Sequence, residues 1–201
     1  LSGANTYTGI TTINAGVIRA QSNAALGSAA GNTVVSGTGA ALEIDGSGLS
    51  IAEPLSIAGT GVGAAGAVRN LANTNTLAGA IALTADAQIS NAAGSLNLTN
   101  TLTGASTITF DVAGGATTTE SGVIADGGMA TSVSKIGVGT LVLSGTNTYT
   151  GTTTISDGTL RVENNSALGG TGTGTSVASP ATLELDNVAI GAEAVNIAGA
   201  C

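Results

Sequence analysis

A long internal repeat constrains the fold of this 201-residue chain more than any other feature. Its first 27 residues, LSGANTYTGITTINAGVIRAQSNAALG, return at 143–169 as LSGTNTYTGTTTISDGTLRVENNSALG, with 17 positions identical. Weaker likeness continues downstream, at 42–46 against 183–187 and at 55–59 against 195–199. A period of 140–142 residues is too long for one turn of a solenoid, so each unit must contain several smaller coils. We expect residues 1–201 to form a single domain, with large units starting at 1 and 143, excerpted from a longer array.

Composition points to short strands around an aliphatic core. The aromatic residues are only Tyr7, Phe110 and Tyr149, so aliphatic side chains must fill the interior. Because Gly (32 residues) and Asn tolerate positive φ, their abundance predicts strands separated by tight turns. High mean hydropathy with few charged residues argues against disorder.

Runs of about four residues in which apolar and polar side chains alternate recur along the chain, each closed by Gly or Asn. They begin at residues 11, 17, 33, 41, 55, 67, 81, 87, 96, 108, 121, 132 and 140. Alternation with period two indicates strands with one buried face, too short and irregularly spaced for a sandwich. We therefore predict an all-β fold, a parallel β-helix whose strands stack ~4.8 Å apart, with Asn or Thr ladders at its corners and faces. At roughly 20 residues per coil the chain would hold about ten coils.

Charge and cysteine usage exclude several partner classes. A net charge of −8 with few aromatic residues argues against nucleic acid, because phosphate binding needs clustered cations. Gly, Thr or Asn interrupts every apolar stretch before ~18 residues, so we expect no transmembrane segment in this chain. The single cysteine, Cys201, corresponds to Gly61 of the first unit and stands outside the repeat pattern. Its thiol is either incidental or a handle for a covalent dimer.

The chain has no histidine, which excludes Ser-His-Asp and Cys-His relays and imidazole metal sites, and we expect no catalytic residue and no cofactor. Two strings mimic catalytic motifs. GVGAAG at 61–66 lacks the helix that a dinucleotide site requires, so we interpret it as a Gly-rich turn. SVSK at 132–135 would place Ser132 and Lys135 on opposite faces of a strand, whereas the penicillin-recognising pattern needs them one helical turn apart.

Carboxylates are the remaining acid-base groups. Glu43 and Asp45 recur as Glu184 and Asp186, and the i, i+2 spacing puts each pair on one strand face, ~7 Å apart. Such pairs could hold Ca²⁺ or act on a glycosidic bond, which makes a polysaccharide-active enzyme the main alternative. The interpretation that we favour is that the alternating Leu and Ile face inward while the acids solvate the outer face. Neither a basic group nor a sugar-stacking aromatic accompanies the pairs.

Threonine pairs offer a possible surface. Thr residues separated by one position recur at 6 and 8, 101 and 103, 107 and 109, 152 and 154, and at 171, 173 and 175. In-register stacking would make a flat face for ice or carbohydrate, but exposed strands ordinarily use Thr, and the sequence leaves the register open.

The most strongly repeated segment holds structural motif residues in both copies: Asn5, Tyr7, Gly9, Asn147, Tyr149 and Gly151. We expect each Asn to bond backbone groups at a corner, and each Tyr to pack over the coil edge with its hydroxyl toward solvent. Tyr as a ligand-stacking group is the alternative.

The segment GVGTLVLSGTNTYTGTTTISDGTLRV at 137–162 resembles the autotransporter-associated β-strand repeat, also called the passenger-associated-transport repeat, and residues 1–18 follow the same pattern. The resemblance implies a right-handed parallel β-helix in a secreted passenger, displayed at the cell surface on the outer membrane of a Gram-negative bacterium. It implies a structural and adhesive, non-catalytic segment whose partners are a host or abiotic surface, or glycans. A filament protein that self-associates through its end coils is a third alternative.

Overall fold

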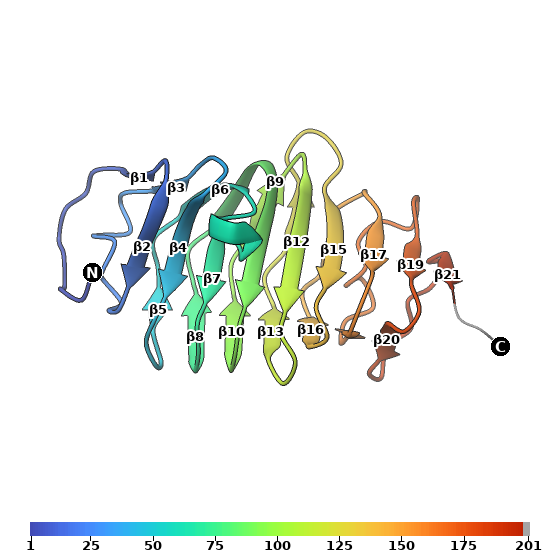
Figure 1. Ribbon diagram of the computed structural model, residues 1–201. Coiled ribbons are helices and arrows are strands. Elements are labelled where there is room, and N and C mark those ends of the chain that lie inside the picture. Colours follow the sequence, from blue (N-terminus) through green and yellow to red (C-terminus); the bar gives the residue numbers. More distant parts are fainter. Residues whose placement is uncertain (199–201) are drawn as a thin grey trace.

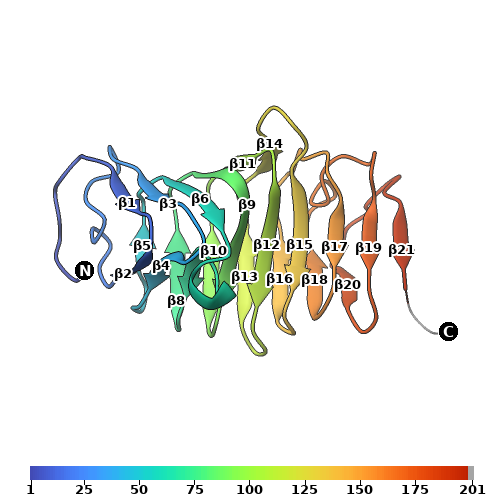
Figure 2. The same cartoon turned by 45° about the horizontal axis from the view of Figure 1, so that its top comes forward.

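Short alternating runs become short strands, and every strand pairing in residues 1–198 is parallel, as predicted for a β-solenoid. The computed structural model describes these 198 residues, and Figure 1 shows them as a rod of stacked coils with the N-terminus at one end. Figure 2 shows the strands arranged in rows along the rod. The prediction of an all-β parallel solenoid is therefore confirmed.

The strands lie in three rows that run along the rod. The first row contains β1 (Thr11–Ile13), β3 (Thr33–Val35), β6 (Leu55–Gly59), the first part of β9 (Ile81–Asn91), β11 (Leu102–Gly104) and β14 (Ile124–Asp126). The second row contains β2 (Gly16–Ala20), β4 (Ala40–Ile44), β7 (Val68–Asn70), the second part of β9, β12 (Thr107–Val112), β15 (Ser132–Ile136), β17 (Thr153–Ile155), β19 (Thr175–Val177) and β21 (Val195–Ile197). The third row contains β5 (Ser50–Ile51), β8 (Thr74–Leu77), β10 (Ser95–Leu98), β13 (Thr117–Glu120), β16 (Thr140–Leu143), β18 (Thr159–Val162) and β20 (Thr182–Leu185). Because β9 belongs to both the first and the second row, these two rows form one 14-stranded sheet. The third row is a separate 7-stranded sheet.

The coils differ in length. Thr140 pairs with Thr159, 19 residues on, whereas Leu55 pairs with Ile81, 26 residues on. The longest coils carry loops between rows, and one such loop contains the short 3-10 helix η1 (Val62–Ala64). Residues 1–198 make about eight turns, roughly the ten expected, and about 40 Å of rod at ~4.8 Å per turn.

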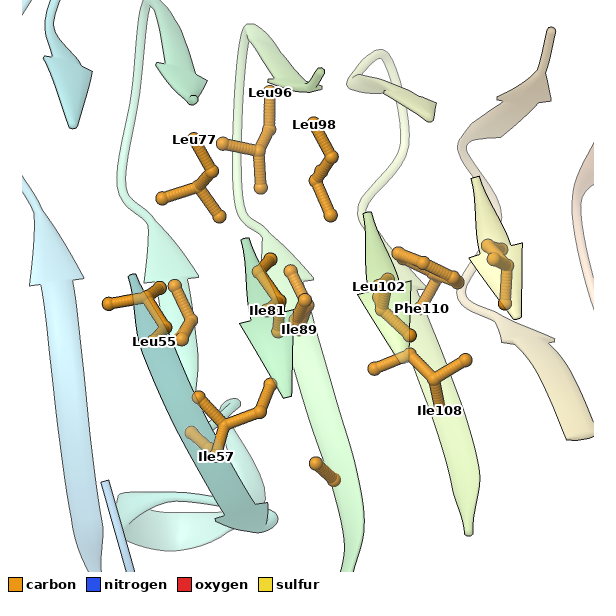
Figure 3. Packing of buried hydrophobic residues seen from close by; sticks show 14 of the residues in the cluster. Leu55, Ile57, Leu77, Ile81, Ile89, Leu96, Leu98, Leu102, Ile108 and Phe110 are labelled. Carbon is orange, nitrogen blue, oxygen red and sulfur yellow. The ribbon is translucent and has the colours of Figure 1, made fainter. Parts of the chain in front are cut away.

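Aliphatic side chains from all three rows fill the interior. Figure 3 shows Leu77, Leu96 and Leu98 of the 7-stranded sheet pointing toward Ile81 and Ile89 of the 14-stranded sheet. Each position along a strand stacks on the same position of the next coil, so the residues form columns along the rod. Burial of each such side chain stabilises the fold by about 1.5–3 kcal/mol.

Buried asparagines mark the corner between the second and third rows. Asn70 Nδ2 donates to Asn91 Oδ1 at 2.9 Å, and Asn75 Nδ2 donates to Asn70 Oδ1 at 2.8 Å. Asn75 also donates to the carbonyl of Gly46, and Asn91 donates to the carbonyl of Thr117. These bonds satisfy turn carbonyls that burial would leave unpaired, and they confirm the predicted Asn ladder at a corner.

The two copies of the repeat occupy different rows. In the first copy β1 and β2 lie in the first and second rows, whereas their counterparts β17 and β18 lie in the second and third rows. Six coils on from β1, the first row reaches the segment around Thr148, whose amide donates to the Ile124 carbonyl at 2.9 Å. The 142-residue period thus spans six coils plus one row, and the two copies face different sides of the rod.

Both end coils expose apolar side chains: Leu1, Ile10 and Val17 at one end, Leu185 and Ile197 at the other. Leu143, the counterpart of Leu1, is fully buried between coils. In the described part of the chain, no helix has the length and apolar character to cross a membrane. Cys201 lies outside the described residues, so the two interpretations of its thiol stay open.

Candidate functional site

The first carboxylate pair lies on the outer face of the second row. Leu42 and Ile44 of β4 are fully buried, and Glu43 between them points outward, with Asp45 directly after the strand. The alternation predicted for this pair is therefore confirmed. The expectation that the acids are simply solvated is wrong for Glu43, whose side chain is only 12% exposed, whereas Asp45 at 36% and Glu184 at 44% remain in contact with solvent.

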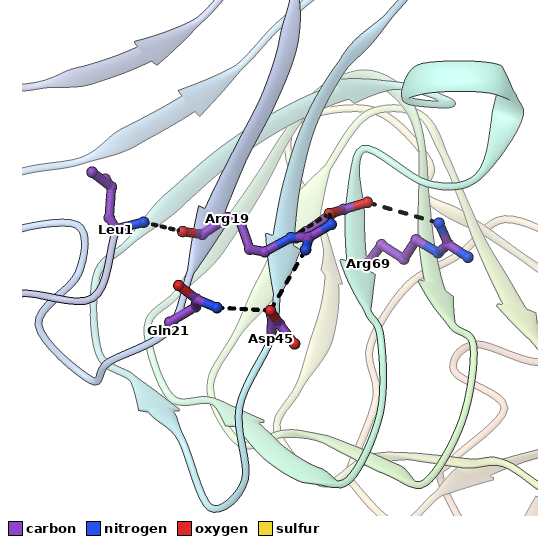
Figure 4. A network of polar contacts seen from close by, with 6 residues as sticks. Leu1, Arg19, Gln21, Asp45 and Arg69 are labelled. Carbon is purple, nitrogen blue, oxygen red and sulfur yellow. Dashed lines mark hydrogen bonds and ion pairs between the residues drawn. The ribbon is translucent and has the colours of Figure 1, made fainter.

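Arginines from the two adjacent coils form ion pairs with Glu43. Arg19 donates to Glu43 Oε2 through Nη2 at 2.7 Å and Nε at 3.0 Å, and Arg69 Nη1 lies 3.8 Å from Glu43 Oε1. Asp45 Oδ2 lies 3.7 Å from Arg19 Nη1 and accepts a hydrogen bond from Gln21 Nε2 at 2.8 Å. Figure 4 shows these contacts. The hydrogen bond to Glu43 and the negative charge of its carboxylate raise the pKa of Arg19. We call this set the arginine ladder.

The second carboxylate pair has a related contact on another row. Arg161 Nε of β18 lies 3.1 Å from Glu184 Oε2 of β20. Arg161 is the repeat counterpart of Arg19, and Glu184 is the counterpart of Glu43. In both copies, therefore, an arginine of one coil pairs with a glutamate of the next, which is a cross-strand pairing that ties coils together.

Loss of the Glu43 charge should weaken the solenoid modestly. Because Glu43→Gln removes the partner of both Arg19 and Arg69, we expect a melting temperature about 2–4 °C lower, with a smaller difference at high salt. Glu163→Gln, at an exposed position, is the matched control and should leave the melting temperature unchanged. Equal melting temperatures for both variants at low salt would show that the ladder contributes nothing.

The third row carries an in-register column of hydroxyl side chains on its outer face. Its members, which we call the hydroxyl column, are Thr74, Ser95, Thr117, Thr140, Thr159 and Thr182. Each is partly or fully exposed. Each is the first residue of a four-residue strand, and the fourth residue of that strand faces the interior column. Two positions further along the strands, Thr76, Asn97 and Thr119 form a shorter second column.

The second row carries another hydroxyl series near the C-terminal end. Thr109, Ser134, Thr154 and Ser176 stack in register. The last two members line a groove of about 320 Å³ together with Thr152, Asn196 and their neighbours. Of the Thr pairs named from sequence, those at 107 and 109 and at 152 and 154 contribute to this series. None of the pairs named from sequence belongs to the hydroxyl column.

The two strings that mimic catalytic motifs have structural roles. β15 places Ser132 outward and Lys135 inward, and Lys135 Nζ donates to the carbonyls of Ile136 at 2.8 Å and Gly137 at 2.6 Å. GVGAAG at 61–66 forms a turn in which Gly61, Gly63 and Gly66 have positive φ. Both interpretations made from sequence are confirmed.

Asn147 of the repeated motif links three coils. The backbone amide of Ile124, in the preceding coil, donates to Asn147 Oδ1 at 2.8 Å. Asn147 Nδ2 donates to the Ala167 carbonyl of the following coil at 2.6 Å. Asn5, its counterpart in the first copy, makes only the second of these contacts, in which Asn5 Nδ2 donates to the Ala25 carbonyl at 2.8 Å. The predicted bonding of Asn to backbone groups is confirmed in both copies.

Tyr149 is fully buried, and its hydroxyl lies 2.6 Å from Thr153 Oγ1. The prediction that this hydroxyl points to solvent is therefore wrong, because the preceding coil covers the ring. Burial raises the pKa of Tyr149 well above its usual value. Tyr7 keeps the same contact, 2.8 Å to Thr11 Oγ1, but without a preceding coil it remains 41% exposed.

Comparison with known families bears on these motif residues. The sequence model of the passenger-associated-transport-repeat matches the chain at residues 1–20 and 133–162. Both segments are copies of this passenger repeat. The matches cover about a quarter of the chain and include all six motif residues. Comparisons with curated proteins and with solved structures found no match.

The passenger repeat indicates a segment associated with the passenger of a secreted or surface-displayed bacterial protein. The motif residues that recur in both copies are those that contact neighbouring coils in the second copy, where a coil precedes the motif. The hydroxyl column lies partly outside the matched residues and was missed from sequence. The signal that would have found it is a Ser or Thr opening each of the tetrads TNTL, SLNL, TTTE, TLVL, TLRV and TLEL.

Proposed function

We propose that this chain is a rigid segment of a bacterial surface protein that acts as a stalk and carries an adhesive face, without catalysis. Support for the stalk comes from the continuous aliphatic interior and the in-register rows, in which each coil contacts its two neighbours. The passenger repeat supports secretion to the surface of a Gram-negative cell.

The hydroxyl column is the surface that best suits adhesion. It stays on one side of the rod over six coils, whereas the two copies of the passenger repeat face different sides. Hydroxyl side chains at regular spacing match the donors and acceptors of a glycan or of a hydroxylated abiotic surface. The partner class that we propose is therefore a polysaccharide or a host surface that carries glycans.

A non-catalytic role agrees with the state of the carboxylate pairs. Glu43 is paired with Arg19 and Arg69, and Glu184 is paired with Arg161, so two of the acids that the sequence offered for glycosidic chemistry have structural partners. Self-association through the end coils stays an alternative, and light scattering that shows only monomer would contradict it.

The test is a glycan panel scored both for binding and for release of reducing sugar. Thr117→Lys with Thr159→Lys places two bulky cations on the hydroxyl column, two coils apart, and should weaken binding at least tenfold. Thr109→Lys with Thr154→Lys, the matched pair on the second row, should leave binding unchanged. Equal loss in both double variants would contradict the assigned face, and release of reducing sugar would favour the enzyme.

A further inference from the structure

One interior column contains a single residue that can ionise. Its members in the third row are Ile51, Leu77, Leu98, Glu120, Leu143, Val162 and Leu185. Glu120 is fully buried between Leu98 and Leu143, where every other coil places an aliphatic side chain. We propose that the coil carrying Glu120 is a pH-responsive joint of the solenoid, closed while this carboxyl is neutral and opening locally when it ionises.

No group of opposite charge stands beside Glu120 in its column. Neither carboxyl oxygen has a hydrogen-bond partner, and the register neighbours from β10 and β16 are leucines. The titratable group on the adjoining segment is Tyr149, whose hydroxyl is neutral and lies beside Thr153. Burial raises the pKa of Glu120 to about 7, and the nearby amide of Gly122 opposes this rise only in part. An unpaired buried carboxylate is costly, so the folded coil favours the protonated acid.

The direction of the pH effect follows from proton uptake. When the coil opens, the carboxyl regains its ordinary pKa of 4.5, so between about 4.5 and 7 the closed coil binds more protons than the open one. Stability contributed by the neutral carboxyl is thus full below the lower value and falls as the pH rises to 7. The same coil contains Lys135, fully buried, with its pKa lowered by burial to about 8 despite the charges of Asp157 and Asp111. Because the closed coil lowers this pKa, Lys135 acts in the opposite direction, but mainly near and above pH 8, so it offsets little of the change below pH 7.5.

The effect should remain local. Each coil of a solenoid contacts only its neighbours, so a cost inside one coil weakens that coil and its two interfaces. The joint lies directly before the second passenger repeat. Glu53, also buried and without a hydrogen-bond partner, has its pKa raised by burial, but it lies three coils away between β5 and β6. Its titration would affect a different part of the rod.

Hydrogen exchange of the complete chain at pH 5.0 and 7.5, corrected for intrinsic rates, tests the proposal. Peptides covering β13 and β16 should lose protection on the order of 50-fold at the higher pH, and peptides covering β19, which is remote from both Glu120 and Glu53, should lose much less. In Glu120→Gln this excess loss should vanish, while Glu163→Gln retains it. Glu120→Leu, which matches the rest of the column, is the second variant if Gln prevents folding. An equal pH effect across all coils, or one that persists in either Glu120 variant, would overturn the proposal.

Discussion

Replacing Tyr149 by Ala should lower the free energy of unfolding by about 4 kcal/mol, because the change leaves a cavity in the interior and removes the partner of Thr153. The same substitution at Tyr7 should cost about 1 kcal/mol, since much of that ring is already in water. Urea unfolding followed by circular dichroism measures both. The two variants change the same motif residue, so their difference isolates the contribution of the preceding coil. Equal losses would contradict a stacking role for the repeated Tyr.

Gly151→Ala should destabilise the solenoid by about 3 kcal/mol. A methyl group at this position would overlap the carbonyl oxygen of Thr131 and the hydroxyl of Ser132, so two coils would have to separate. Gly9, its counterpart in the first copy, has open space where the methyl group would lie.

Gly9→Ala is therefore the matched control, and it should change the free energy of unfolding by less than about 0.5 kcal/mol. Neither glycine has a positive φ, so backbone strain does not complicate the comparison. Thermal unfolding of both variants gives the answer. Equal tolerance at the two positions would mean that the coils do not approach each other as closely as the structure indicates.

The sequence predicted strands wherever apolar and polar residues alternate cleanly, as in Leu55–Gly59 and Thr107–Val112. It missed Thr74–Leu77 and Thr117–Glu120, because these strands place polar side chains inside the solenoid. Asn75 is buried there by bonding to Asn70 and to backbone carbonyls, and Glu120 is buried without a partner. A rule that assigns polar residues to the outside cannot identify such strands.

The register in which strands of successive coils pair could not be predicted from the sequence either. Separations of 19 to 28 residues between paired positions shift each strand by an amount that the loops decide, so spacing alone could not align the threonines. Because coil length varies, the sequence also could not show that the second copy of the repeat lies one row further around the rod than the first. The arginine ladder depends on this register too, since Arg19, Glu43 and Arg69 meet only because β2, β4 and β7 are paired.

The passenger repeat and the adhesive surface have separate roles in this account. The motif residues hold coils together, and the recognition that we propose belongs to the outer face of the third row. This separation predicts that a destabilising change in the motif leaves affinity intact while the protein remains folded.

The most direct test measures glycan or surface binding by Tyr149→Ala, at a temperature where both it and the unsubstituted protein are fully folded, together with the melting temperature of each. We predict a lower melting temperature for Tyr149→Ala and unchanged binding. Loss of binding at an unchanged melting temperature would contradict the account, because Tyr149 would then contact the ligand.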